Sequence, residues 1–323
     1  MKKMNTSKID MRVAEITKLT PEVSSYRLVR IDGSAVPAFA AGAHIDVVLA
    51  DGLQRQYSLC NGPDDKNHYS IAVKREADSR GGSRAIHETF RIGSAVSVGL
   101  PRNNFPIEAG ASEHLLIAAG IGVTPLLSMA RHLKAASRPF KLEYFTRSAE
   151  LTAFADEIRS EFGDAATVHA GTSLAELPSR LADILVRRAS DQHAYICGPA
   201  PFMKLASNIA GASWPASAVH MEHFAPDSEK SFGETRPFKV QISGKSKTFD
   251  VPADKSILDV LLENGIACDF SCKEGTCGSC LVGVSSGEID HRDSFLSDAE
   301  KADGETMVIC VSRAKGDLIV IDL

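Results

Sequence analysis

The chain has 323 residues, of which 44% are hydrophobic and 24% are charged, and its formal net charge is −5. This length allows two or three globular domains, and the composition is that of a soluble protein. The sequence has no apolar signal-peptide core and no run long enough to cross a bilayer, so we expect a cytoplasmic protein without membrane contact. The acidic balance and the lack of a basic stripe argue against a nucleic-acid binder.

Residues 1–108 form the first predicted domain. Short runs of alternating apolar and polar residues, separated by Asp-Gly and Asn-Gly-Pro turns, predict antiparallel strands that close into a small barrel. The expected strands are 13–16, 25–29, 44–49, 56–59 and 69–74. One helix is expected at 83–90, directly after Gly81 and Gly82.

Within this domain, Arg55-Gln56-Tyr57-Ser58 suggests a cofactor strand. Tyr57 and Ser58 are suited to place a ring and a hydroxyl against an isoalloxazine, while Arg55 neutralises a phosphate. Gly81-Gly82-Ser83 precedes a helix whose N-terminus favours an anion, and Ser83 is equally suited to cap that helix. Taken alone, the first motif is a strand of ordinary residues.

Residues 109–225 change to an alternation of strands and helices. Apolar strands at 115–118, 141–145 and 194–197 alternate with helices at 125–135, 152–162 and 201–210. Continuous apolar strands joined by helices predict a parallel sheet covered on both faces.

Two motifs follow strands of this sheet, at the edge where open α/β folds bind ligands. Gly120-Ile121-Gly122-Val123-Thr124-Pro125 opens a helix, so its glycines permit a tight turn and close approach of a pyrophosphate. A simple strand-to-helix turn explains the same residues. Cys197-Gly198-Pro199 ends a later strand, where Cys197 faces the nicotinamide or is a half-buried thiol. Thr146 and Arg147 are expected beside the adenosine ribose, and Arg147 leaves NADPH open beside NADH.

Residues 226–236 are polar and rich in turn formers, which predicts a linker. Residues 237–323 form the third predicted domain, with a hairpin of strands 238–242 and 246–251 and a helix at 256–264.

Four cysteines of this third domain, Cys272, Cys277, Cys280 and Cys310, have the C-x₄-C-x₂-C…C spacing of a plant-type [2Fe–2S] site. The alternative is a Cys₄ zinc site, which usually has paired C-x₂-C hooks. Cys268 fits no two-iron spacing, and we predict that it is not a ligand. A disulfide framework is not expected from the remaining cysteines.

The charge is also uneven. From Arg236 onward there are 10 Lys and Arg against 15 Asp and Glu, which leaves 26 of each sign in residues 1–235. An acidic surface around a redox centre steers it toward a basic partner, although such charges also form ordinary solvated surfaces.

Together, these motifs in this order resemble the phthalate dioxygenase reductase family, which includes vanillate demethylase reductases and belongs to the ferredoxin–NADP⁺ reductase superfamily. The resemblance covers essentially the whole chain. It implies an FMN-binding β-barrel, an NAD-binding α/β domain and a β-grasp ferredoxin domain, with FMN rather than FAD. The FMN residues it implies are Arg55, Gln56, Tyr57, Ser58, Ala72, Val73, Lys74, Gly81, Gly82, Ser83 and Phe224. The NAD residues it implies are Gly120, Ile121, Gly122, Thr124, Pro125, Thr146, Arg147, Cys197, Gly198 and Pro199.

The same resemblance places Phe224 on the flavin face where nicotinamide enters, although a core phenylalanine beside a linker explains that residue equally well. It implies an NADH-dependent reductase, without a general acid or nucleophile, that passes electrons from NADH through FMN and [2Fe–2S] to a terminal Rieske oxygenase or demethylase. A monomer suffices for this arrangement. The alternatives are another acceptor, such as a diiron monooxygenase or free flavin, and an electron carrier with a vestigial nucleotide site.

Overall fold

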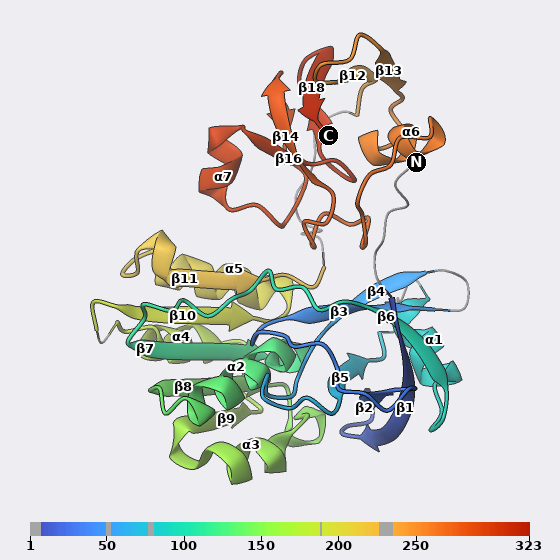
Figure 1. The fold of residues 1–323 in the computed structure, drawn as a ribbon. Helices are drawn as coiled ribbons and strands as arrows, with labels where there is room; N and C mark the ends of the chain where they lie inside the picture. The colour runs from blue at the N-terminus through green and yellow to red at the C-terminus, as the bar shows by residue number, and fades with distance from the viewer. Residues whose placement is uncertain (1–7, 50–52, 77–80, 188, 226–234) are drawn as a thin grey trace. The chain divides into compact units, whose positions relative to one another are not determined.

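The computed structural model describes residues 8–49, 53–76, 81–187, 189–225 and 235–323 (Figure 1). The chain separates into two compact units, one spanning Thr6–Glu222 and the other containing His223–Leu323. Most of the predicted linker, residues 226–234, lies outside the described residues. No helix in the described part of the chain is long and apolar enough to cross a membrane.

The first unit begins with an antiparallel sheet of six strands in the order β4-β3-β6-β1-β2-β5. Its edge strands meet through a bridge between Leu59 and Ile71, which closes the sheet into the expected barrel. Met11, Leu28, Ile45 and Ile71 fill its interior and are fully buried. The elements are β1 (Lys8–Lys18), β2 (Val23–Arg30), β3 (His44–Val48), β4 (Gln54–Ser58), β5 (Tyr69–Lys74), α1 (Gly82–Thr89) and β6 (Ala95–Gly99).

A parallel sheet in the order β11-β10-β7-β8-β9 follows in the same unit, as expected. Alternate residues of its strands face opposite ways: Leu116 packs with α2 and α3, whereas Ile117 packs with α4 and α5. The strands are β7 (Glu113–Ala119), β8 (Phe140–Thr146), β9 (Ala166–Ala170), β10 (Gln192–Cys197) and β11 (Val219–Glu222). The helices are α2 (Val123–Ala135), α3 (Ala155–Phe162), α4 (Leu177–Ile184) and α5 (Ala200–Ala210).

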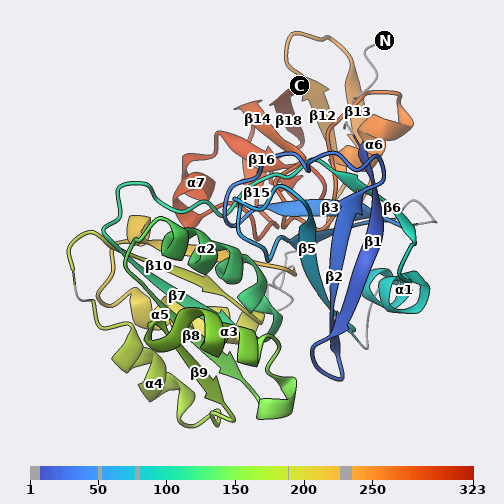
Figure 2. The same cartoon turned by 60° about the horizontal axis from the view of Figure 1, so that its bottom comes forward.

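The barrel has its own buried core, and a few further residues of the barrel domain join the hydrophobic cluster on one face of the parallel sheet. Figure 2 shows both sheets of this unit. Ala72 and Phe105 of the barrel domain belong to the same buried cluster as residues of α2. Two hydrogen bonds reinforce this contact, because Ser128 Oγ donates to the Asn61 carbonyl at 2.9 Å and Arg131 donates to the Cys60 carbonyl at 2.6 Å. Helix α2 therefore connects the end of β4 to the parallel-sheet half of this unit.

The second unit contains a mixed sheet in the order β13-β12-β18-β14-β16, in which only β12 and β18 are parallel. Helix α6 packs against it, with Leu258 and Leu261 fully buried. The elements are β12 (Phe238–Ile242), β13 (Thr248–Val251), α6 (Ile257–Glu263), β14 (Leu281–Ser286), β15 (Ile289–Asp290), α7 (Asp298–Asp303), β16 (Thr306–Val308), β17 (Arg313–Ala314) and β18 (Leu318–Asp322). Cys272, Cys277 and Cys280 lie in the long loop between α6 and β14.

Candidate cofactor sites

The structure brings the two predicted flavin motifs of the barrel together. Gly81 has φ 96° and lets the chain turn into α1, which begins at Gly82. The Arg55 side chain lies against Gly82, so a Cβ on residue 82 would come within 2.6 Å of Arg55 Cγ. A guanidinium beside a helix N-terminus fits a phosphate group, which takes charge from the one and N–H groups from the other.

The neighbouring predicted residues have mixed environments. Lys74 Nζ pairs with Glu76 at 3.0 Å, and Ser83 Oγ accepts a hydrogen bond from the Glu76 N–H at 3.2 Å. Gln56 Nε2 lies 3.2 Å from His44 Nε2. Burial raises the pKa of Tyr57. Ser83 therefore holds the chain near α1, a role compatible with a phosphate loop.

Two more of the flavin residues that the resemblance names, Ala72 and Val73, lie in β5 next to this region. Ala72 and Val73 are buried, and the Val73 carbonyl contacts His87 Nε2 at 2.9 Å.

The nucleotide motif forms a tight turn at the end of β7. Gly120 has φ 54° and begins a short 3₁₀ turn that leads into α2. Gly122 lies against the strand that ends at Cys197: a Cβ at position 122 would lie 2.3 Å from the Cys197 carbonyl oxygen. Thr124 Oγ1 donates to the Ile121 carbonyl at 3.0 Å. The turn and the Cys197-Gly198-Pro199 segment therefore meet at one sheet edge.

The predicted ribose side is more open. Thr146 is buried and its hydroxyl lies 2.6 Å from the Thr152 hydroxyl, so it supports the local backbone. Arg147 is exposed. Of this pair, Arg147 is the side chain available to a ligand.

Sequence reasoning missed Glu222. It ends β11 directly opposite Cys197 in the parallel register, and Ser58 Oγ donates to Glu222 Oε2 at 3.4 Å. Burial raises the pKa of Glu222 to about 8, and burial followed by the Glu222 charge raises the pKa of the Cys197 thiol. Ser58, a predicted flavin residue, and Cys197, a predicted nicotinamide residue, therefore both lie beside the Glu222 carboxyl. The only local signal was its place two residues before Phe224.

Phe224 belongs to the other compact unit and is 41% exposed. Its predicted place over the flavin stays a prediction.

The four predicted cluster cysteines gather in the second unit. Cys277, Cys280 and Cys310 are buried and Cys272 is partly exposed. The four thiols lie close together, because Cys272 interacts with Cys277 and Cys310, and Cys310 also interacts with Cys280. These contacts lower the pKa of Cys272 and raise those of Cys277 and Cys310. Four adjacent thiolates repel one another, so all four lose their protons only around a cationic group.

This donor set fits a two-iron cluster better than a zinc ion. The C-x₄-C-x₂-C…C spacing of these ligands is that of a plant-type two-iron cluster, whereas structural zinc sites usually have paired C-x₂-C hooks.

The loop backbone supports the sulfurs. The Glu274 N–H donates to Cys272 Sγ at 3.3 Å and the Ser279 N–H donates to Cys277 Sγ at 3.5 Å. Gly278 has φ 67°, and a Cβ there would lie 2.3 Å from the Phe295 ring. A side chain at position 278 would therefore displace the ring or the loop. Cys268 is buried, and its thiol points to the Ile266 carbonyl.

The barrel, the parallel-sheet domain and the cysteine loop define the class of NAD(P)H-dependent flavin and iron–sulfur oxidoreductases. A family model for the 2Fe-2S iron-sulfur cluster binding domain matches residues 240–315. The chain is 40% identical to a vanillate O-demethylase oxidoreductase of Acinetobacter baylyi, over 98% of this chain and 99% of that protein. It is also 40% identical to a phthalate dioxygenase reductase of Burkholderia cepacia, over 97% of each. The chain belongs to the phthalate dioxygenase reductase family.

A solved phthalate dioxygenase reductase shares the fold. It is described as a modular structure for electron transfer from pyridine nucleotides to [2Fe-2S]. It superposes with a TM-score of 0.73 at 39% identity, over 98% of each chain. The family and the three-part fold expected from the sequence are therefore confirmed.

Proposed function

We propose that this chain is the NADH-dependent reductase component of a Rieske-type aromatic-ring oxygenase or O-demethylase, with the electron order NADH, FMN, [2Fe–2S], terminal oxygenase. A bound flavin accepts two electrons as hydride and releases them singly, which joins a two-electron donor to a one-electron carrier. The single observation that carries the proposal is the meeting of Ser58, Cys197 and Glu222. It unites the flavin motif and the nicotinamide motif at one point.

The barrel residues have the binding role. Arg55 and the N-terminus of α1 are placed to hold one terminal phosphate, which favours FMN over a dinucleotide flavin. Tyr57 and Ser58, on the same strand, supply a ring and a hydroxyl beside it. Their place on a barrel strand, packed through α2 against the other half, keeps this geometry rigid.

The sheet-edge residues orient the nicotinamide end. Gly122 lets the turn after β7 pack directly against the Cys197 backbone, and Arg147 is proposed to bind the adenosine end. At neutral pH the Cys197 thiol and the Glu222 carboxyl both keep their protons, because burial raises both pKa values. Uncharged side chains at this point suit the transfer of a hydride, since no fixed charge opposes it.

The acceptor is proposed from relatives and charge. The relatives are reductases named for vanillate O-demethylase and phthalate dioxygenase. The acidic surplus of residues 236–323 suits docking to a basic patch on a protein partner. All cofactor sites lie in one polypeptide, so a cytoplasmic monomer suffices.

An anaerobic titration tests the route. The purified holoprotein is mixed with NADH and, separately, with NADPH, while the visible spectrum and the EPR spectrum are recorded. We expect NADH to bleach the flavin and to produce the EPR signal of a reduced [2Fe–2S] cluster. A flavin that stays oxidised with both nucleotides, yet bleaches with dithionite, would indicate a vestigial nucleotide site. Extraction of the flavin and mass spectrometry distinguish FMN from FAD.

A second experiment tests the acceptor. The reduced chain is mixed anaerobically with a Rieske oxygenase component, and in parallel with a diiron hydroxylase and with free flavin. Rapid oxidation by the Rieske component alone supports the proposal. Equal rates with all three acceptors contradict it, and sedimentation of the holoprotein shows whether it is a monomer.

A further inference from the structure

The segment after β15 lies against the cysteine loop. The Ser294 N–H donates to the Gly275 carbonyl at 3.0 Å, and a Cβ on Gly275 would lie 3.2 Å from Asp293 Cα. Phe295, two residues further on, covers Gly278. This segment therefore contacts the loop at both glycines between the first three cysteines.

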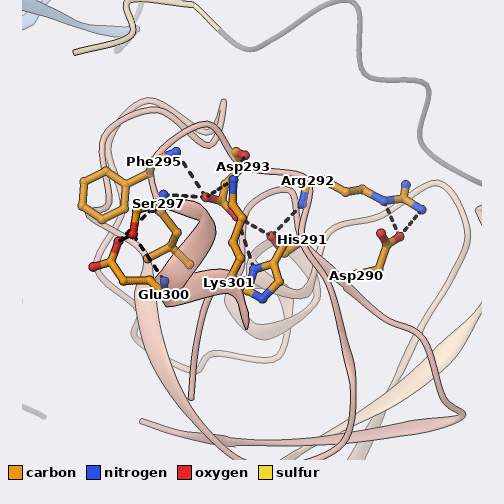
Figure 3. Close-up of polar contacts among 10 residues, drawn as sticks. Asp290, His291, Arg292, Asp293, Phe295, Ser297, Glu300 and Lys301 are labelled. Carbon is orange, nitrogen blue, oxygen red and sulfur yellow. Dashed lines mark hydrogen bonds and ion pairs between the residues drawn. The ribbon is translucent and has the colours of Figure 1, made fainter. Parts of the chain in front are cut away.

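Asp293 is the centre of this contact (Figure 3), and its side chain is fully buried. Its Oδ2 accepts hydrogen bonds from the N–H groups of Phe295 at 3.2 Å and Leu296 at 2.8 Å. Its Oδ1 accepts one from Ser312 Oγ at 3.3 Å, and Ser312 lies two residues after Cys310. Donors on both oxygens match a carboxylate, which only accepts. Asp293 thus links the loop that carries Cys272, Cys277 and Cys280 to the segment that follows Cys310.

One cation faces this carboxylate from helix α7. Lys301 Nζ donates to the Asp293 carbonyl at 2.9 Å and lies 3.7 Å from Asp293 Oδ2. Ser297 and Glu300 form a capping box that fixes the start of the same helix. His291 Nδ1 lies 3.6 Å from Asp293 Oδ1, and burial lowers its pKa, so it adds no charge at neutral pH. Lys301 therefore places a positive charge, itself mostly buried, next to the buried negative charge of Asp293.

We propose that Asp293 and Lys301 are positioning residues that set the reduction potential of the iron–sulfur centre through opposite charges. This inference rests on the proposed cluster site. Buried charges are weakly screened, and a negative charge near the cysteine loop opposes the addition of an electron. Asp293 lowers the potential, Lys301 raises it, and their hydrogen bonds hold both charges in fixed places beside the loop.

The test uses two charge-neutralising variants that keep the hydrogen bonds. Asp293→Asn retains an oxygen for the two N–H groups, and the Ser312 hydroxyl can turn to accept from its amide. Lys301→Gln retains a donor for the Asp293 carbonyl. Lys245→Gln is the matched control, because it removes the same charge from an exposed position of the same unit.

The midpoint potential of the cluster in each holoprotein is measured by an EPR-monitored redox titration. We expect a positive shift for Asp293→Asn, a negative shift for Lys301→Gln and no shift for Lys245→Gln. Potential shifts of the same sign for Asp293→Asn and Lys301→Gln, or an unchanged potential in both, overturn the proposal. A merely structural role does not predict shifts of opposite sign. If Asp293→Asn loses the cluster, Lys301→Gln alone decides: a negative shift supports the proposal and any other result overturns it. Absence of the EPR signal from the parent protein would instead refute the proposed function.

Discussion

Replacing Gly82 by alanine tests whether Arg55 and the start of α1 together hold the flavin phosphate. A Cβ at this position would lie 2.6 Å from Arg55 Cγ, 3.0 Å from Nε and 3.2 Å from Cδ. Carbon atoms normally approach to about 3.5–4.0 Å, so the Arg55 side chain has to move by about 1 Å. It can do so, because it is flexible, but its guanidinium then leaves the place where the phosphate is expected.

The magnitude follows from the contact that is lost. A hydrogen bond to a charged group contributes about 1.5–3 kcal/mol, and about 1.4 kcal/mol is a factor of ten, so the Kd for FMN should rise about 10- to 150-fold. The free energy of unfolding of the Gly82→Ala variant should not fall. Gly82 does not adopt a positive φ, so alanine fits the helix start and reduces the freedom of the unfolded chain, which stabilises by about 0.4–1 kcal/mol.

The assay is fluorescence titration of the apoprotein with FMN. Arg55→Gln and the double variant complete a double-mutant cycle, and Gly110→Ala is the control, because the nearest atom to its Cβ is 3.6 Å away. If Gly82 acts through Arg55, the double variant loses little more affinity than Arg55→Gln alone. Unchanged FMN affinity in Gly82→Ala, or losses that simply add, would refute the reasoning.

Three further predictions concern the other sites. Cys310→Ser should abolish the iron–sulfur EPR signal, whereas Cys268→Ser should keep it; the reverse pattern would refute the ligand assignment. Gly122→Ala places a Cβ 2.3 Å from the backbone oxygen of Cys197, which cannot give way, so NADH should no longer bleach a flavin that dithionite still bleaches. Glu222 has a pKa raised by burial from 4.5 to about 8, so its stabilising contribution is complete below pH 4.5 and is lost as the pH rises to 8. The melting temperature of the apoprotein should therefore fall more steeply between pH 5 and 9 in the parent than in Glu222→Gln.

Local patterns predicted much of this fold. The strands expected at 69–74 and 238–242 have those bounds in the structure, because each is a run of β-forming residues between clear turn signals. The helix expected from residue 152 begins at Ala155 instead, since Phe154 adopts φ 61° and Thr152 bonds back to the Ser148 carbonyl. Strand β11 was not expected, because four residues are too few to show a period.

Contacts between distant segments could not be predicted in this way. Ser58 and Glu222 are 164 residues apart, and only the closed barrel and the parallel register of β10 and β11 bring them together. In the sequence, Asp293 cannot be distinguished from a surface carboxylate of an acidic domain. The tertiary structure shows that the cysteine loop and Ser312 contact it. Spacing identifies ligands that lie in one loop, but tertiary packing determines which carboxyl groups are buried beside them.

One physical feature is common to the three candidate sites: each has a glycine whose missing side chain leaves space for another part of the protein. Gly82 faces the flexible Arg55 side chain, Gly278 faces the Phe295 ring, and Gly122 faces the backbone of Cys197. These neighbours differ in how far they can move, so the cost of adding a Cβ should increase from Gly82 to Gly278 to Gly122. The positive φ of Gly278 adds a second cost at that position. At Gly122 and Gly278 the neighbour is backbone or a packed ring, so alanine should disrupt the nucleotide and cluster sites. At Gly82 the neighbour is a flexible side chain, so alanine should only weaken flavin binding.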